Sequence, residues 1–445
     1  MAKLIPSRLA LALVGAWLVL ALAAAFVDSL LLAWQVAGVV LAALLAADGL
    51  AGLRIVDPAS VERRVPANLA LGRWTPATLH LSRVRRSLRG FLHDAYPSAF
   101  DAADVPQPVA IEPGQTAALT YRLRPLARGH HHFGPVAARI DTPLRLWQRG
   151  LALGEPADVR VYPDFARITQ YTLLATDHRL SQIGVLQRRR RGEGLDFHQL
   201  REYRHGDTSR QIDWKATARV GRLISREYQD ERDQRIVFLV DCGQRMRAHD
   251  GATADADHAL SHFDHALNAL LLLAYVALRQ GDAVGVQTFG HPQPRWLAPR
   301  KSVATVNVLL DALFDLEPSH ATPDYLVACE RLYAQLTRRS LVVIVTNLRD
   351  EDDSQVLGAL RLLRRRHLTL VANLREPGLD QAAATRPRTF DDALAYGAAA
   401  EYLMARAATI ARLRREGARV LDAHPQELPR MLVNQYWQMK RAGEI

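Results

Sequence analysis

The chain has 445 residues, of which 49% are hydrophobic, and it carries a formal net charge of +11. This length predicts two or three domains rather than one, and the charge favours anionic partners such as phospholipid headgroups, nucleic acid or an acidic protein. The two cysteines, Cys242 and Cys329, exclude a disulfide framework and are typical of a reducing compartment.

Residues 1–54 are predicted to form a membrane anchor. Residues 9–27 and 30–47 are apolar runs, each long enough to cross a bilayer as a helix. Basic residues precede the first run and follow the second, but none lies between them. This charge pattern predicts a multi-pass protein of the inner membrane whose N-terminus and soluble domains are in the cytoplasm. The alternative is a cleaved signal peptide, which the immediate second apolar run disfavours.

Residues 55–165 are predicted to form a β-sandwich-like domain. Runs such as 77–81 and 117–123 are rich in strand formers and alternate in part, and turn motifs separate them. We interpret this domain as a spacer, with ligand binding as the alternative. Three consecutive histidines, 130–132, lie in it. Neighbouring side chains on a strand point to opposite faces, so a structural role is favoured over a metal site.

Residues 166–232 are predicted to be a linker followed by a folded, highly charged segment. The four arginines at 188–191 indicate an exposed loop, or alternatively a contact with lipid phosphate or nucleic acid. From residue 194 onward, basic and acidic residues are interleaved with aromatic ones. Guanidinium groups that pair with carboxylates and stack on rings fit this composition. These residues alone are compatible with two interpretations, a salt-bridged solvent-exposed surface and a binding surface.

This segment carries a family resemblance. The run Phe197-x-x-Leu200-Arg201-Glu202-Tyr203-x-x-Gly206-Asp207, then Ile212-Asp213-Trp214-Lys215-Ala216-x-Ala218-Arg219, resembles the signature of the family known as domain of unknown function 58. The resemblance implies a C-terminal domain similar to the von Willebrand factor A fold and a MoxR-type AAA+ ATPase as partner. The predicted interaction surface comprises Arg201, Glu202, Tyr203, Gly206, Asp207, Asp213, Trp214, Lys215 and Arg219.

Residues 233–445 alternate between strand and helix patterns. Residues 235–241, 283–289 and 341–346 are short apolar runs typical of buried parallel strands. Helical patterns separate them, which predicts an open parallel sheet with helices on both faces. Together with the resemblance, the expected fold is an α/β domain resembling a von Willebrand factor A domain.

The resemblance also implies where a divalent ion would bind. Von Willebrand A domains hold one with an Asp-x-Ser-x-Ser loop, a later threonine and a later aspartate, because hard cations need clustered oxygen ligands. The matching positions here are Asp241, Gly243, Arg245, Thr322 and Asn347. Gly243 and Arg245 stand where the pattern has serines, and Asn347 stands where it has the later aspartate. We therefore expect no metal ion at this site, and an Asp241–Arg245 ion pair in its place.

Other catalytic motifs are absent from the sequence. It contains no phosphate-binding glycine loop, zinc-protease helix or nucleophile elbow. Two kinds of catalytic pair remain possible. One is a thiol–base pair of Cys242 with His249 or His262, although a buried structural cysteine is favoured over it. The other is an acid–base pair of His205 with Asp207. We therefore expect no enzymatic activity and no cofactor.

The leading hypothesis is a membrane-anchored, cytoplasm-facing adaptor or scaffold without catalytic activity. It would work with a MoxR-type AAA+ ATPase in protein maturation or envelope stress, as the resemblance implies. One alternative is a nucleic-acid or anionic-polymer binding protein, which the missing aromatic neighbours of the arginine run disfavour. The other is a divalent-metal-dependent adhesion-type module using Asp241 and Thr322.

Overall fold

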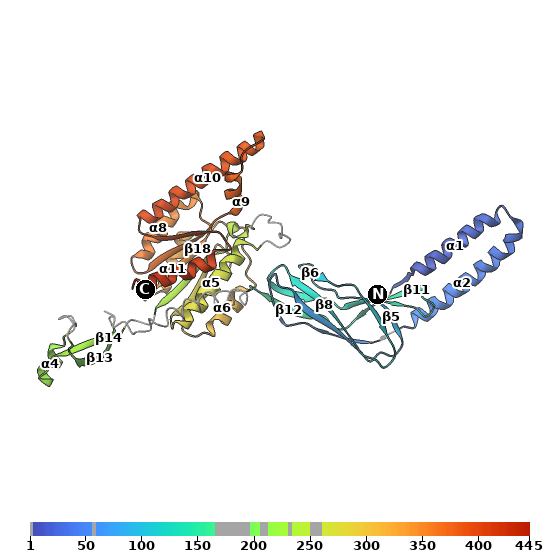
Figure 1. Cartoon of the computed structure of the whole chain (residues 1–445), viewed down its shortest axis with the longest axis horizontal. Helices are drawn as coiled ribbons and strands as arrows, with labels where there is room; N and C mark the ends of the chain where they lie inside the picture. The colour runs from blue at the N-terminus through green and yellow to red at the C-terminus, as the bar shows by residue number, and fades with distance from the viewer. Residues whose placement is uncertain (1–2, 56–58, 165–195, 205–211, 230–233, 250–259) are drawn as a thin grey trace. The chain divides into compact units, whose positions relative to one another are not determined.

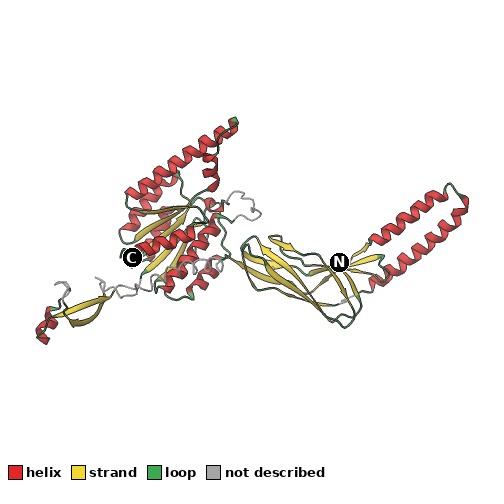
Figure 2. Ribbon diagram, viewed as in Figure 1, coloured by secondary structure: helices red, strands yellow, loops and turns green. Residues whose placement is uncertain are grey.

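A computed structural model describes residues 3–55, 59–164, 196–204, 212–229, 234–249 and 260–445. The chain divides into two compact units, Met1–Tyr162 and Pro163–Ile445. The first unit holds two apolar helices and a β-rich region, and the second holds a mixed α/β sheet (Figures 1 and 2). The protein is therefore multi-domain.

The first unit begins with a short strand and two helices. They are β1 (Lys3–Pro6), α1 (Arg8–Ala24) and α2 (Leu31–Leu53), and a 3-10 turn (Asp28–Leu30) precedes α2. The helices pack through stacked rings of Trp17 and Trp34, whose centroids lie 5.6 Å apart. The continuous helical stretch Asp28–Leu53 is long and apolar enough to cross a membrane, whereas α1 has only 17 residues. The sequence-based bounds differ, because α1 ends earlier than residue 27 and α2 continues past residue 47.

Both helices are attached to the β-rich region. β1 was not expected from the sequence, and it pairs antiparallel with β11 (Trp147–Leu153) directly before α1. At the other end, Asp48 of α2 is 1% exposed and accepts hydrogen bonds from the backbone N–H groups of Leu144 and Leu146, at 2.9 and 3.0 Å. The last turns of α2 therefore belong to the folded β-rich unit.

The β-rich region consists of three sheets. Their strand orders are β1-β11-β10-β5-β7, β3-β12-β9 and β2-β4-β8-β6. Alternate residues of β4 and β10 are buried, as expected for strands with one face against a core. The further strands are β2 Ser60–Arg64, β3 Asn68–Ala70, β4 Thr75–Ser82, β5 Leu88–His93, β6 Phe100–Ala103, β7 Gln107–Ile111, β8 Ala117–Pro125, β9 Gly129–Phe133, β10 Val136–Asp141 and β12 Ala157–Tyr162.

A buried polar group joins the three sheets. Asp94, which follows β5 and is 0% exposed, pairs with Arg63 of β2 at 2.5 Å and accepts a hydrogen bond from Tyr121 of β8. The Arg63 guanidinium also lies over the Phe133 ring of β9, 4.9 Å from its centroid. Each charge is therefore compensated inside the core, as buried charges must be. The histidines of β9 alternate in exposure, and His132 pairs with Asp158 at 2.8 Å.

The second unit begins with a small β-hairpin that carries a helix. β13 (Asp196–Glu202) pairs antiparallel with β14 (Ile224–Gln229), and α4 (Trp214–Val220) lies in the connection between them. This hairpin corresponds to the charged segment that the sequence predicted to be folded.

The rest of this unit is a six-stranded sheet of order β17-β16-β15-β18-β19-β20. In chain order this is 3-2-1-4-5-6, the order of doubly wound α/β sheets. The predicted open parallel sheet is mixed in the structure, because its edge strand β17 pairs antiparallel with β16. The strands are β15 Arg235–Asp241, β16 Ala283–Phe289, β17 Trp296–Arg300, β18 Leu341–Thr346, β19 Leu368–Leu374 and β20 Arg419–Ala423.

Helices cover both faces of this sheet (Figure 1). Alternate residues of β15 point to opposite faces: Phe238 packs in a core with α5, α6 and α11, and Leu239 in a second core with α7 and α8. Burial on both faces explains the continuous apolar strands. The helices are α5 His262–Arg279, α6 Thr305–Leu313, α7 Tyr325–Gln335, α8 Asp353–Arg364, α9 Pro377–Ala384, α10 Phe390–Arg415 and α11 Leu428–Arg441.

Candidate functional site

The carboxyl edge of the six-stranded sheet is the first place to examine. The strand order reverses between β15 and β18, and ligands of open α/β sheets bind at such a point. Asp241, the last residue of β15, is 0% exposed. One carboxyl oxygen accepts a hydrogen bond from Gly243 N (2.8 Å) and the other from Thr346 Oγ1 (2.7 Å). Burial raises the pKa of Asp241 to about 6.

The predicted ion pair between Arg245 and Asp241 is wrong. The buried Arg245 guanidinium instead pairs with Asp352, at the start of α8, and with Glu351 at 3.3 Å. Both oxygens of Asp241 already accept hydrogen bonds, whereas the sequence places an acidic run, 350–353, after the neighbouring strand, and Glu351 and Asp352 of that run pair with Arg245. That run is the sequence signal that could have identified the partner, although the two residues are 107 positions apart.

The loop of Thr322 lies near Asp241, because a Cβ on Gly243 would come 2.8 Å from the Ala321 carbonyl oxygen and 3.1 Å from an Asp241 carboxyl oxygen. Thr322 is exposed, and the Asn347 amide donates to Glu376 Oε1 at 2.8 Å. Because of the contact with the Ala321 carbonyl oxygen, a serine in place of Gly243 needs a backbone shift. Within the described ranges, no group of three His, Cys, Asp or Glu side chains is placed to hold a metal ion. Gly243, Arg245 and Asn347 supply no hydroxyl or carboxylate ligand at the positions where the family pattern has them.

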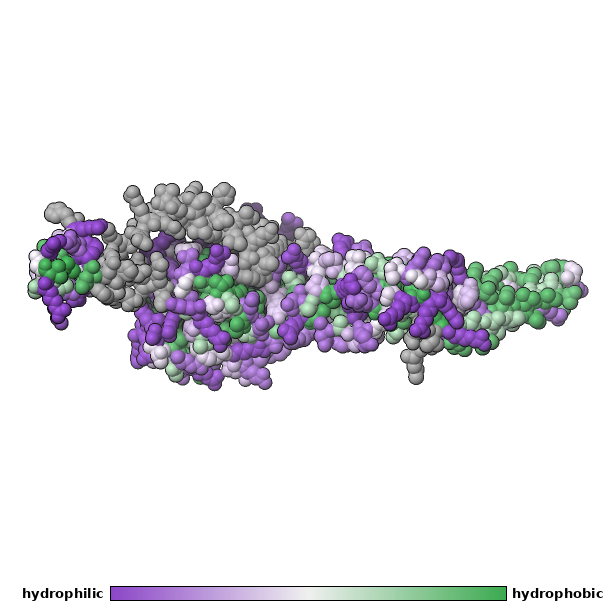
Figure 3. Space-filling model, turned by 90° about the horizontal axis from the view of Figure 1, so that it is seen from below, coloured by the Kyte–Doolittle hydropathy of each residue, from purple (hydrophilic) through white to green (hydrophobic). Residues whose placement is uncertain are grey.

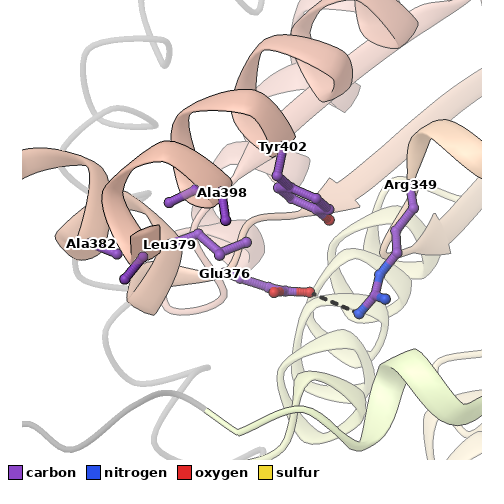
Figure 4. Close-up of a pocket in the computed structure, with 8 residues that line it drawn as sticks. Arg349, Glu376, Leu379, Ala382, Ala398 and Tyr402 are labelled. Atoms are coloured by element: carbon purple, nitrogen blue, oxygen red, sulfur yellow. Dashed lines mark ion pairs between the residues drawn. The ribbon is translucent and has the colours of Figure 1, made fainter. Parts of the chain in front are cut away.

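A pocket of about 440 Å³ lies beside this edge, between α9, α10 and the loop after β18 (Figure 4). At its polar end Arg349 faces Glu376, with 3.7 Å between guanidinium nitrogen and carboxylate oxygen. Burial, and then the Glu376 charge, raise the pKa of Tyr402, so its phenol stays protonated. Its apolar lining is made by Leu379, Ala382, Ala395, Ala398 and Ala399. No sequence motif predicted this pocket.

The hairpin of β13, α4 and β14 contains the predicted interaction residues. Asp213 caps α4, because one carboxyl oxygen accepts hydrogen bonds from the backbone N–H groups of Lys215 and Ala216, both at 3.0 Å. Its other oxygen pairs with Arg226 of β14 at 2.9 Å. These hydrogen bonds, led by the one from Ala216, hold the pKa of Asp213 below its usual value. Asp213 therefore shapes the segment rather than forming its free surface.

The other predicted residues lie around this cap. Glu202 pairs with Arg222 at 2.8 Å, and the Arg201 guanidinium donates to the carbonyl of Glu202 at 3.0 Å. The Tyr203 N–H donates to the Leu223 carbonyl at 2.9 Å, which extends the hairpin. Lys215 and Arg219 are exposed on α4. Gly206, Asp207 and His205, like the arginines at 188–191, lie outside the described residues.

Trp214 is the most exposed of the segment's large apolar side chains that the structure describes. It is 66% exposed at the first position of α4. Three other apolar side chains of the segment are also exposed, and Figure 3 shows an apolar area bordered by hydrophilic side chains on this hairpin. We call this set the Trp214 patch; its members are Leu200, Trp214, Val220 and Leu223. Exposed apolar patches rimmed by charge are typical of protein-binding surfaces.

A family model described as "Protein of unknown function DUF58" matches residues 199–385. That range runs from β13 to just beyond α9, so it contains both the Trp214 patch and the Asp241 edge. Among curated proteins, the uncharacterized protein YeaD of Bacillus subtilis (strain 168) is 23% identical over 180 residues, which is 39% of this chain and 39% of YeaD. The chain thus matches about two fifths of the length of that relative.

Two solved structures are similar at low identity. The conserved hypothetical protein BatB from Bacteroides thetaiotaomicron is 10% identical with a TM-score of 0.29, over 47% of this chain and 99% of BatB. An aerotolerance-related membrane protein from Bacteroides fragilis NCTC 9343, carrying multiple mutations to serine, is 14% identical with a TM-score of 0.23, over 32% of this chain and 67% of that chain. At these TM-scores neither likeness defines the fold or the activity of this chain.

Proposed function

We propose that this protein is a membrane-anchored adaptor without catalytic activity that docks a MoxR-type AAA+ ATPase through the Trp214 patch. The partner class comes from the family resemblance of the signature, and the family match over residues 199–385 supports that resemblance. The apolar surface of α1 and α2, visible in Figure 3, supports membrane attachment. In this proposal both helices cross the inner membrane, and the soluble units face the cytoplasm.

The observation that carries the docking proposal is the exposure of Trp214. Trp214 is 66% exposed on a short helix, and leaving a large apolar side chain in water is unfavourable compared with burying it. The helix is nevertheless held by a cap at each end, Asp213 before it and Gly221 in a left-handed conformation after it. A rigid, exposed aromatic side chain with an apolar border is the usual centre of a binding interface. Scaffold work in protein maturation or envelope stress is the role this arrangement would serve.

The α/β unit is proposed to be a von Willebrand factor A-like domain without the metal site. The support is its strand order, its single antiparallel edge strand β17 and the position of Asp241 at the end of the central strand. Arg245, with its carboxylate partners, supplies a fixed positive charge beside that end. The domain would then present a permanently shaped surface rather than a cation-dependent one.

Co-purification of the full-length protein from its own membranes in mild detergent tests the docking proposal. Truncation of a central interface tryptophan costs about 2 kcal/mol or more, which is about 30-fold in affinity. We therefore expect Trp214→Ala to lose the ATPase that the wild type retains. Phe390→Ala is the matched control, because Phe390 is an aromatic side chain 78% exposed on α10, outside the segment. Equal recovery of the ATPase with Trp214→Ala, or recovery of nucleic acid alone, would refute the proposal.

A further inference from the structure

The edge of the six-stranded sheet opposite Asp241 is lined by arginine along its whole width. The five parallel strands begin at this edge, and the antiparallel strand β17 ends there. Each of the six strands has arginine at or just before that end. Across the sheet from β17 to β20 these are Arg300, Arg279, Arg235, and the arginines at 338–339, 364–366 and 414–415. We call Arg300 and the arginines at 338–339, 364–366 and 414–415 the arginine edge.

Contacts between neighbouring loops bring these side chains together. Arg366 donates a hydrogen bond to the Leu336 carbonyl at 3.3 Å, which joins the loop before β19 to that before β18. Its guanidinium also lies 4.5 Å from the ring centroid of Tyr333 on α7. Arg339 donates to the Glu444 carbonyl at 3.3 Å, near the end of the chain. The arginines at 338–339 and 364–366 therefore lie on neighbouring loops of the same edge, although they belong to separate runs of the sequence.

The charge of this surface is only partly compensated within the described part of the chain, where Glu416 attracts Arg364 but forms its ion pair with Arg361. All members of the arginine edge are exposed, and none of them forms an ion pair with a described residue. The described carboxylates nearby already have other partners: Asp282 pairs with Lys440, Glu416 with Arg361, and Glu444 with Arg419. Eight like charges held on one rim repel one another and raise the local potential. An anionic partner removes that repulsion.

We propose that the arginine edge binds an anionic phospholipid surface. The cations lie beside four of the six strands, β17, β18, β19 and β20, which suits a flat array of phosphate headgroups, and each basic residue near such a surface adds about fivefold to binding. Tyr333 lies among them but is covered by Arg366, whereas single-stranded nucleic-acid sites present open rings for stacking. The chain's own apolar helix Asp28–Leu53 keeps a membrane at high effective concentration. This inference rests on membrane association alone and not on the ATPase partner.

The test uses the full-length protein in liposomes. Cys242 and Cys329 are 0% exposed, so a donor fluorophore can be placed selectively with Thr337→Cys, an exposed position beside Arg338. Energy transfer to a headgroup-linked acceptor is compared in pure phosphatidylcholine and with one part phosphatidylglycerol to two parts phosphatidylcholine, at low and high salt. The test variant is Arg338→Gln/Arg339→Gln/Arg415→Gln. The control variant, Arg247→Gln/Arg386→Gln/Arg388→Gln, removes the same charge from exposed arginines elsewhere on this unit.

We expect transfer to rise when phosphatidylglycerol is present and to fall again at high salt, because screening weakens contacts between exposed charges. The test variant should lose this rise, because removing three arginines lowers the equilibrium constant for contact between the arginine edge and the anionic lipid about a hundredfold. The control variant should keep the rise. Transfer that ignores the anionic lipid, or is reduced equally in both variants, overturns the proposal. The proposal is also overturned if a labelled single-stranded oligonucleotide binds the detergent-solubilised protein through the same three arginines, while energy transfer to the lipid acceptor is the same in wild type and test variant.

Discussion

The Asp241 carboxyl group is 0% exposed and accepts two hydrogen bonds, one from Gly243 N and one from Thr346 Oγ1. Burial raises its pKa from 3.8 to about 6. The folded chain therefore holds an extra proton between these two pH values, and its stability falls as pH rises through that window. A shift of about two pKa units corresponds to about 3 kcal/mol.

We predict that Asp241→Asn removes this pH dependence. Relative to the wild type, the variant should gain stability between pH 4 and pH 7, by up to about 3 kcal/mol. The amide can keep the hydrogen bond from Gly243, while the Thr346 hydroxyl turns to accept from the new amino group. Hydrogen exchange of peptides that cover β15 and β18 measures the effect in the full-length protein.

The control for this prediction is Asp324→Asn. Asp324 is exposed and caps α7 by accepting a hydrogen bond from Val327 N at 3.0 Å, a role that asparagine performs equally well. Its exchange should follow the wild type at every pH. An unchanged difference between wild type and Asp241→Asn from pH 4 to pH 7 would show that the buried carboxyl group does not titrate in this window.

At the residue scale, the sequence carried no information about contacts between distant partners. Asp213 and Trp214 were singled out by the family signature, and the structure places them at the start of one capped helix, while their role in an interaction surface stays a prediction. The partner of Arg245 lies 107 positions away, and spacing along the chain gives no information about such a contact. The pocket around Arg349 and Tyr402 was missed for the same reason, since its lining comes from three separate elements.

At the scale of elements, strands buried on both faces were the most predictable. β15, β16 and β18 have the bounds that their apolar runs indicated. β17 was missed because this short edge strand contains Pro299, which weakens a strand pattern. β1 was missed because four residues before an apolar helix look like its flank, and its pairing with β11 is visible only in three dimensions.

The junction of α2 with the β-rich unit leads to an element-scale prediction. Asp48→Ala removes the acceptor for Leu144 N, Leu146 N and the Thr142 hydroxyl. Buried donors left without an acceptor cost about 1–3 kcal/mol each. We expect the turn 142–147 to exchange its amide hydrogens at least tenfold faster in detergent. Asp28→Ala, which removes an exposed carboxylate near the other end of the same helix, should leave that turn unchanged.

At the scale of the whole molecule, the two apolar helices are attached to the β-rich unit at both of their outer ends. β1 fixes the start of α1 to β11, and Asp48 fixes the end of α2 to the turn before the same strand. If both helices cross the membrane, as proposed, an anchor held at both ends sets the orientation of the β-rich unit against the bilayer, which a flexible linker would not do. This attachment supports the interpretation of the β-rich unit as a spacer.

The direction of the two helices decides which side of the membrane the soluble units occupy. α1 has 17 residues and spans about 26 Å, close to the shortest helix that crosses a bilayer. If both helices cross, the exposed Ser29 lies outside the cell and the second unit inside. We predict that a membrane-impermeant maleimide labels Ser29→Cys, but not Thr337→Cys, in sealed right-side-out vesicles, and that inside-out vesicles give the reverse. The buried native thiols give little background, because burial raises the pKa of Cys329 to about 12. Labelling of both positions from the same side would mean that α2 does not cross the membrane, and the adaptor would then need a different orientation.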